Sequence, residues 1–104
     1  MRPIHLARLD KTRPVLLLTR ATSGERMSQV TVAPLTSTVR GLDSEVALDA
    51  RNGVDHPCAA SIDNTLTINR LNLGRQIGWL FDDQEPQLAR AISYAFDLKL
   101  PDDL

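Results

Sequence analysis

Apolar and polar positions divide this chain into several short segments typical of β-strands and one later segment typical of an α-helix. Residues 15–18 are the longest uninterrupted aliphatic run, and breakers or charges bound the run on both sides, as in a buried strand. This strand is expected over residues 15–20. Alternating or β-branched segments predict further strands at 4–9, 30–35, 45–49, 58–62, 66–68 and 76–81.

The end of the chain has the period of an amphipathic helix. Its apolar residues recur at spacings of three and four and so share one face: Leu88, Ala91, Ile92, Ala95 and Phe96. Asp82 or Asp83 suits the N-cap, Pro86 suits the first turn, and Pro101 should end the helix.

Short connections join the predicted strands, so the sheet should be mainly antiparallel and curl into a small barrel. The connections expected are a tight turn at 10–12, a polar loop at 21–28, an Asn-Gly loop at 51–57, a helical turn at 69–72 and a break at Gly74. With 104 residues, a single domain over 1–104 is expected, mainly β with one C-terminal helix.

Charge is nearly balanced overall but unevenly distributed. The formal net charge is −1, with ten basic and seven acidic residues in 1–80 and two basic and six acidic residues in 81–104. Ten of the twelve cations are Arg, the side chain best suited to bidentate phosphate contacts. No stretch approaches the roughly 20 apolar residues of a membrane helix, and the start lacks the apolar core of a signal peptide. With one cysteine, Cys58, a cytoplasmic location is expected.

Metal and nucleotide sites have little support. His5, His56 and Cys58 are the chain's only imidazole and thiol groups, and they lack the usual ligand spacings. Cys58 is expected to be an inert core thiol and His5 a strand-face residue. No glycine-rich phosphate loop is present, so no cofactor is expected. The aromatic side chains are expected to pack in the core: Trp79, Phe81, Tyr94 and Phe96.

An arginine and a threonine form the remaining candidate site. Pro14 fixes the start of the 15–20 strand, so Arg13 stands at the mouth of that strand. If this strand pairs with 30–35 across the loop at 21–28, the hairpin brings Arg13 opposite Thr36. A guanidinium beside a hydroxyl suits a phosphate site that needs no metal. The plainer interpretation is a solvated charge flanking a strand.

Three segments resemble the MazF/PemK (Kid-like) endoribonuclease toxins of type II toxin–antitoxin systems. They are Arg-Pro-Val-Leu-Leu-Leu at 13–18, Val-Ala-Pro-Leu-Thr-Ser at 32–37 and Ser-Ile-Asp-Asn-Thr-Leu-Thr-Ile at 61–68. Their order agrees with the family, as does a helix after Leu-Gly-Arg-Gln-Ile-Gly at 73–78. The resemblance covers essentially the whole chain.

The resemblance implies a fold and an activity. The fold would be the small SH3-like antiparallel barrel shared with CcdB, in a homodimer that holds single-stranded RNA across its interface. The protein would cut RNA at a short sequence without a metal, leaving a 2′,3′-cyclic phosphate and a 5′-OH. A cognate MazE-like antitoxin would block the RNA groove.

The family's catalytic residues map by resemblance to Arg13 and Thr36. Asp63 and Asn64 fall where the family carries an acid–amide pair near the RNA bases. Ser37 and Arg40 would contact RNA phosphates. Turn chemistry for Asp63 and Asn64, and a solvated loop for Ser37 and Arg40, remain open as plainer interpretations.

The chain also departs from the family. Many relatives have a longer loop before the Arg-Pro segment than residues 10–12 provide here, so the loops at 21–28 and 51–57 are candidates for additional RNA contacts. The acidic end lacks the Trp-Gly-Ile tail by which CcdB-type proteins engage gyrase. A gyrase poison and a non-catalytic barrel that only binds a partner remain alternatives. The group that removes the 2′ proton is left open, because Arg stays protonated.

Overall fold

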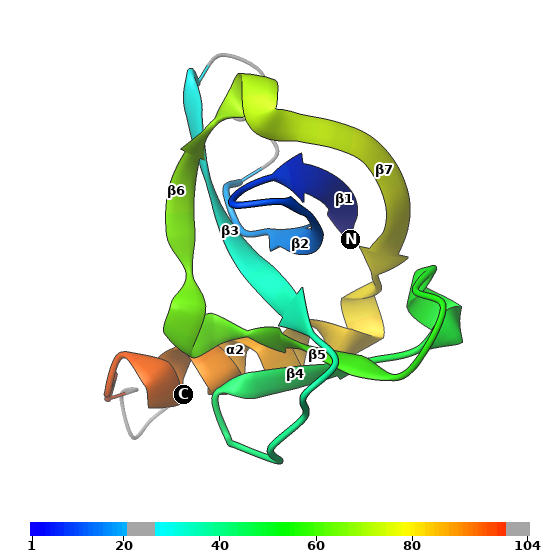
Figure 1. Ribbon diagram of the computed structural model, residues 1–104. Coiled ribbons are helices and arrows are strands. Elements are labelled where there is room, and N and C mark those ends of the chain that lie inside the picture. Colours follow the sequence, from blue (N-terminus) through cyan, green and yellow to red (C-terminus); the bar gives the residue numbers. More distant parts are fainter. Residues whose placement is uncertain (21–26, 100–104) are drawn as a thin grey trace.

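In the part of the chain that the structure describes, a curled antiparallel sheet packs against a helix (Figure 1). The computed structural model describes residues 1–20 and 27–99. The strands are β1 (Arg2–Arg8), β2 (Thr12–Leu17), β3 (Gln29–Thr36), β4 (Glu45–Leu48), β5 (Cys58–Ser61), β6 (Leu66–Asn69) and β7 (Leu73–Leu80). Short 3₁₀ turns lie between them: η1 (Ala50–Asn52), η2 (Ile62–Asn64), η3 (Arg70–Asn72) and η4 (Asp82–Gln84). The helix is α2 (Glu85–Ala95).

The strand order is β4-β5-β3-β2-β1-β7, and β6 pairs with β3 beside this path. Each of these pairings is antiparallel. The long strand β3 crosses the molecule and pairs with β6 over its first half, with β2 at residues 32–34 in its middle and with β5 at its end. The predicted mainly-β, barrel-like architecture is therefore confirmed as a curled half-barrel.

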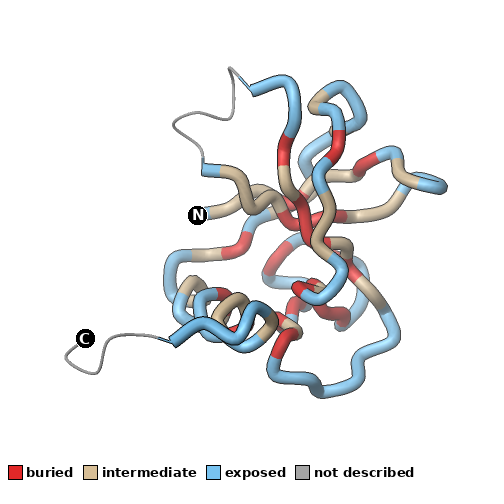
Figure 2. The backbone as a smooth tube through the Cα atoms, turned by 90° about the vertical axis from the view of Figure 1, so that its left-hand side faces the viewer, coloured by how far each residue is buried: buried red, intermediate tan, exposed pale blue. Residues whose placement is uncertain are grey.

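Two hydrophobic cores lie on opposite faces of the central strands. Leu16, Ala33 and Leu35 belong to the larger core, whereas Val15 and Val32 belong to the smaller one. Successive strand residues point to opposite faces, so a strand buried on both sides needs an unbroken apolar run. This two-sided burial explains the aliphatic run at 15–18. Figure 2 shows the buried segments concentrated in the middle of the molecule.

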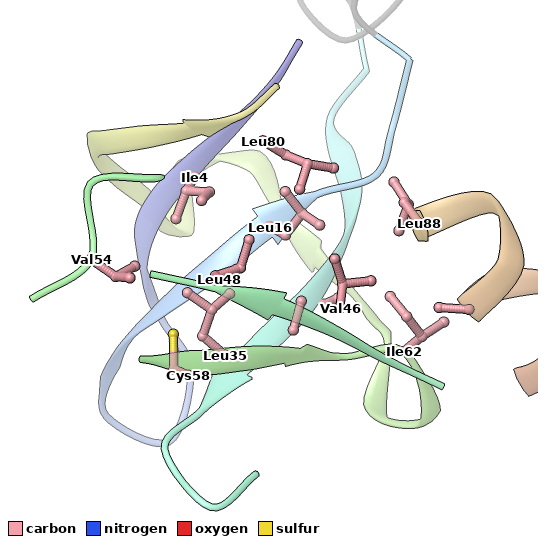
Figure 3. Close-up of a cluster of buried hydrophobic side chains, with 13 residues drawn as sticks. Ile4, Leu16, Leu35, Val46, Leu48, Val54, Cys58, Ile62, Leu80 and Leu88 are labelled. Carbon is pink, nitrogen blue, oxygen red and sulfur yellow. The ribbon is translucent and has the colours of Figure 1, made fainter. Parts of the chain in front are cut away.

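The helix α2 closes the larger core. Leu88 and Ala91 are buried, and Ile92 and Ala95 pack partly against the same cluster. Figure 3 shows Leu88 facing the cluster that includes Leu16 and Leu80. Of the residues that the structure describes, none belongs to a helix long and apolar enough to cross a membrane.

The expected aspartate N-cap is wrong. Asp82 and Asp83 lie inside η4, and the α2 N-cap is Gln84, whose side chain makes no capping hydrogen bond to that helix. Gln84 Oε1 instead accepts from the Phe81 amide at 3.0 Å, while Asp82 and Asp83 pair with the N-terminal amine and Arg51.

Three of the four aromatic residues are also not in the core. The exposed fractions of Trp79, Tyr94 and Phe96 are 38%, 61% and 58%. Aliphatic side chains already fill both cores, and Tyr94 and Phe96 come at the end of α2, beyond its buried turns. Phe81 is partly buried, with the Arg51 guanidinium 4.6 Å from its ring centre.

Several boundaries differ from the sequence-based expectation. Strand β1 starts at Arg2 rather than at residue 4, and β2 runs from Thr12 to Leu17 rather than over 15–20. The break expected at Gly74 is wrong, because this residue lies within β7. A Cβ there would lie 3.1 Å from the Leu6 carbonyl oxygen, so glycine allows β1 and β7 to approach closely.

The helical turn expected at 69–72 is present as η3. Residues 21–26 of the expected polar loop, and Pro101, lie outside the described residues.

The Asn-Gly turn packs directly on β7. Asn52 is buried, and its Nδ2 donates to the Trp79 carbonyl oxygen at 2.8 Å and to Gln84 Oε1 at 2.7 Å. Gly53 follows in the left-handed conformation, with φ of 89°. This turn fixes the start of the segment that leads to β5.

Replacement of Gly53 by alanine should destabilise the protein more than Gly41→Ala does. Both glycines have positive φ, 89° and 70°, so alanine carries a left-handed penalty of about 1–2 kcal/mol at either position. Only at Gly53 would the new Cβ meet backbone, 2.2 Å from the Ile77 oxygen. We expect Gly53→Ala to lower the free energy of unfolding by roughly 3 kcal/mol or more, measured by urea denaturation. Equal losses for the two variants would contradict the close packing of this turn on β7.

Candidate active site

The pairing of β2 with β3 places Arg13 and Thr36 at the same end of the sheet. Val15 faces Pro34 and Leu17 faces Val32, which is the register predicted from the sequence. Continued by two residues, this register puts Arg13 opposite Thr36, the last residue of β3. Both residues line one surface hollow of about 370 Å³. The structure therefore brings the two main candidates together.

Arg13 is held by Asp10 from the preceding turn. Its Nε donates to Asp10 Oδ1 at 2.9 Å and its Nη2 donates to Oδ2 at 3.2 Å. Both side chains are more than a third exposed, so the pair contributes little to folding but fixes the direction of the guanidinium. Hydrogen bonds from Arg13 and from the Lys11 backbone lower the pKa of Asp10 to about 2. The pair therefore stays ionised throughout the physiological pH range.

Thr36 lies where two hollows meet. Its Oγ1 accepts a hydrogen bond from the Thr38 amide at 3.1 Å, which leaves its own O–H able to donate elsewhere. Ser37 lines the hollow that contains Arg13. A second hollow of about 430 Å³ adjoins Thr36 and Thr38 on the other side.

The second hollow contains the predicted base-contacting residues. Arg40, Asp63 and Asn64 line it together with Thr36. Asp63 follows the buried Ile62 in η2 and accepts from Ser44 Oγ at 2.6 Å. Asn64 Nδ2 donates to Ser61 Oγ at 2.7 Å. The six predicted site residues thus lie along two adjoining hollows that share Thr36. We call this surface the Arg13–Asn64 groove.

The structure adds residues that sequence reasoning missed. The sequence pattern indicates only a turn residue at Asp10, although it lies three residues before Arg13 across a tight turn. From the sequence, His56 is singled out only as a weak metal ligand within the 51–57 loop, yet it lines the hollow of Arg13 and Thr36 together with Lys11 and Asp55. Little in the sequence points to His56, because its place depends on how the β4–β5 connection folds back toward β2.

Cys58 lines the same hollow but remains a core residue, as expected. It is 7% exposed, and burial raises the pKa of its thiol. Figure 3 shows its sulfur beside the aliphatic cluster. Among residues 1–20 and 27–99, no group of three or more His, Cys, Asp or Glu is arranged to hold a metal ion.

Substitution of Arg13 should raise the pKa of Asp10. In an Arg13→Gln variant, that pKa should rise from about 2 toward the ordinary aspartate value of about 4. A lowered carboxyl pKa stabilises the folded state above the ordinary pKa, and this contribution is lost as the pH falls toward 2. An NMR titration of the Asp10 carboxyl carbon measures the change. The same midpoint in both proteins would show that the pair does not form in solution.

Comparison with known proteins identifies the family of this chain. Residues 4–96 match the family described as "PemK-like, MazF-like toxin of type II toxin-antitoxin system". Endoribonuclease MazF3 of Mycobacterium tuberculosis (strain ATCC 25618 / H37Rv) is 59% identical over 98 residues, which cover 94% of this chain and 95% of that protein. Probable endoribonuclease MazF2 of the same strain is 44% identical over 66 residues, or 62% of this chain and 65% of the relative.

Solved structures show the same fold. Mycobacterium tuberculosis toxin MazF-mt6 has a TM-score of 0.93 and 57% identity, covering 95% of this chain and all of that one. An endoribonuclease from a mycobacterial species, solved with its cognate antitoxin, has a TM-score of 0.83 at 20% identity, covering 95% of each chain, and supports the fold alone. These similarities do not favour the gyrase-poison or non-catalytic alternatives. The chain belongs to the PemK-like, MazF-like toxins of type II toxin–antitoxin systems.

Proposed function

We propose that this chain is a sequence-specific endoribonuclease toxin that cuts single-stranded RNA without a metal ion. The observation that carries the proposal is the placement of Arg13 and Thr36 in one hollow at the end of the β2–β3 hairpin. In the reaction, the ribose 2′-OH attacks the adjacent phosphorus, and the O5′ atom leaves. The products are a 2′,3′-cyclic phosphate and a 5′-OH.

Arg13 suits the stabilisation of the transition state. The pentacoordinate phosphorus centre gains negative charge, and a guanidinium already fixed in place stabilises that charge without reorganisation. Asp10 supplies this fixation through two hydrogen bonds. The Thr36 hydroxyl can donate to a non-bridging phosphate oxygen, because it accepts from the backbone at Thr38.

The rest of the Arg13–Asn64 groove suits single-stranded RNA. Ser37 and Arg40 are exposed donors on either side of Thr36 and fit phosphate contacts. Asp63 and Asn64 present a carboxylate and an amide, which can pair with the edges of unstacked bases. Ser44 and Ser61 hold these two side chains in place.

Membership of the family also supports proposals about the protein's domain extent, location, oligomeric state and partner. We propose one MazF-like unit over residues 1–104 that acts in the cytoplasm as a homodimer. A cognate MazE-like antitoxin would cover the RNA groove and block cleavage.

Loss of either central side chain should abolish most of the cleavage. Removal of one transition-state donor costs about 10²–10³ in rate, so we expect losses of this size for Arg13→Ala and for Thr36→Val. Thr36→Val keeps the side-chain shape and removes only the hydroxyl, while Thr36→Ser should retain much of the activity. The measurement is the single-turnover cleavage rate of a defined RNA.

Arg90→Ala is the matched control, because Arg90 is an exposed cation on α2 outside the Arg13–Asn64 groove. Its cleavage rate should equal that of the wild type. Folded Arg13→Ala and Thr36→Val proteins that cleave at the wild-type rate would overturn the assignment.

Asn64 should affect which RNA motif is cleaved more than it affects the chemical step of cleavage. An unmade hydrogen bond to a buried polar group costs about 1–3 kcal/mol, so Asn64→Ala should slow cleavage at the preferred motif by roughly tenfold or more. Cleavage at motifs that differ at the base Asn64 contacts should change little. Sequencing of fragments from a random RNA pool, with Asn72→Ala as the control, measures this. An unchanged motif would assign Asn64 to turn structure.

A further inference from the structure

The proposed reaction needs a group that accepts the 2′-OH proton, and neither central residue provides one. Arg13 stays protonated, and the Thr36 hydroxyl is a very weak base. Asp10 is already bound to Arg13, and its pKa of about 2 makes it a poor proton acceptor at neutral pH. Cys58 is buried, and burial raises the pKa of its thiol.

His56 occupies the same hollow and has the right chemistry. It lines the hollow with Arg13 and Thr36 and is 57% exposed at its side chain, so RNA can reach it. Its Nδ1 lies 2.5 Å from Asp55 Oδ1. An ionised carboxylate only accepts, so the hydrogen bond places the proton on Nδ1 and leaves the lone pair on Nε2. Among residues 1–20 and 27–99, none hydrogen-bonds to Nε2.

The loop that carries His56 is anchored on both sides. Val54 and Cys58 are 8% and 7% exposed and belong to the larger core, where Figure 3 shows them at one end of the cluster. Gly53 also packs against the β7 backbone. An exposed side chain between two buried anchors is more closely positioned than one on a free loop.

We propose that His56 is the general base of the cleavage reaction and that Asp55 is its positioning residue. This inference rests on the endoribonuclease function proposed above. His56 Nε2 takes the proton as the 2′-O–H bond breaks, and the 2′ oxygen forms its bond to phosphorus. The P–O5′ bond breaks, and the leaving O5′ takes a proton from water. The imidazolium then returns its proton to the solvent, which restores the enzyme.

The charges around His56 fit this role. Lys11 and Arg13 face the hollow from the β1–β2 turn and the start of β2 and provide positive charge for the phosphate. Asp55 provides the negative charge next to the ring, which stabilises the imidazolium that forms during attack. The only other titratable group that lines this hollow among the described residues is the Cys58 thiol.

Substituting the two histidines one at a time distinguishes a general base from a structural residue. The chain has two histidines, and His5 lies on β1 with its Nδ1 at 2.9 Å from the Gly74 oxygen, outside the hollow. We expect His56→Gln to lower the maximal cleavage rate by about 10²–10⁴ with little change in KM, whereas His5→Gln keeps the wild-type rate. Asp55→Asn should cause a smaller loss. The pH profile of the cleavage rate should differ between the wild type and His56→Gln, because the variant lacks the imidazole.

The outcomes distinguish this inference from the proposed function. Added imidazole should restore part of the cleavage by a His56→Ala variant, which a structural role would not allow. Cleavage by His56→Gln at the wild-type rate and with the wild-type pH profile, while Arg13→Ala is inactive, would overturn the inference alone. A low rate for His56→Gln that keeps the wild-type pH profile would also overturn it. Intact RNA after incubation with the folded wild-type protein would overturn both proposals.

Discussion

The antiparallel pairing of β2 with β3 is the constraint on which the rest of this structure depends. Strand β2 has β1 on one side and β3 on the other, and its residues alternate between two cores. A register shift of one residue would exchange the neighbours of Val15 and Leu16 between these cores. The same shift would separate Arg13 from Thr36. Burial of the aliphatic run therefore fixes the geometry of the candidate site.

Core residues also position the other polar groups of the site. Thr36 follows the buried Leu35, and Asp63 follows the buried Ile62. His56 lies in the loop between Val54 and Cys58, which are both buried. A rigid hydrophobic framework thus holds exposed polar side chains at its edge, which is the arrangement that electrostatic stabilisation of a transition state requires.

Much of the fold followed from local patterns in the sequence. The aliphatic run at 15–18 predicts a buried strand, and the position of the loop that follows predicts the register of the β2–β3 hairpin. The helical period after residue 85 predicts α2. The resemblance to a toxin family added Asp63, Asn64, Ser37 and Arg40, which the structure places in the groove with Arg13 and Thr36.

Features that depend on contacts between distant segments could not be predicted in this way. The exposure of Tyr94 and Phe96 depends on how much core the aliphatic residues already fill. Gly74 was expected to break a strand, but the close approach of β1 makes it part of β7. Likewise, His56 lines the hollow of Arg13 on a loop that follows Gly53, whose close packing on β7 links segments distant in the sequence.

The most direct test of the central claim is to map the ends of RNA fragments produced by the purified protein in the presence of EDTA. If Arg13 and Thr36 form a metal-independent cleavage site, the cuts should fall at one short motif and leave 2′,3′-cyclic phosphate and 5′-OH ends. RNA that remains intact with folded, antitoxin-free protein, or cleavage that EDTA abolishes, would contradict the account.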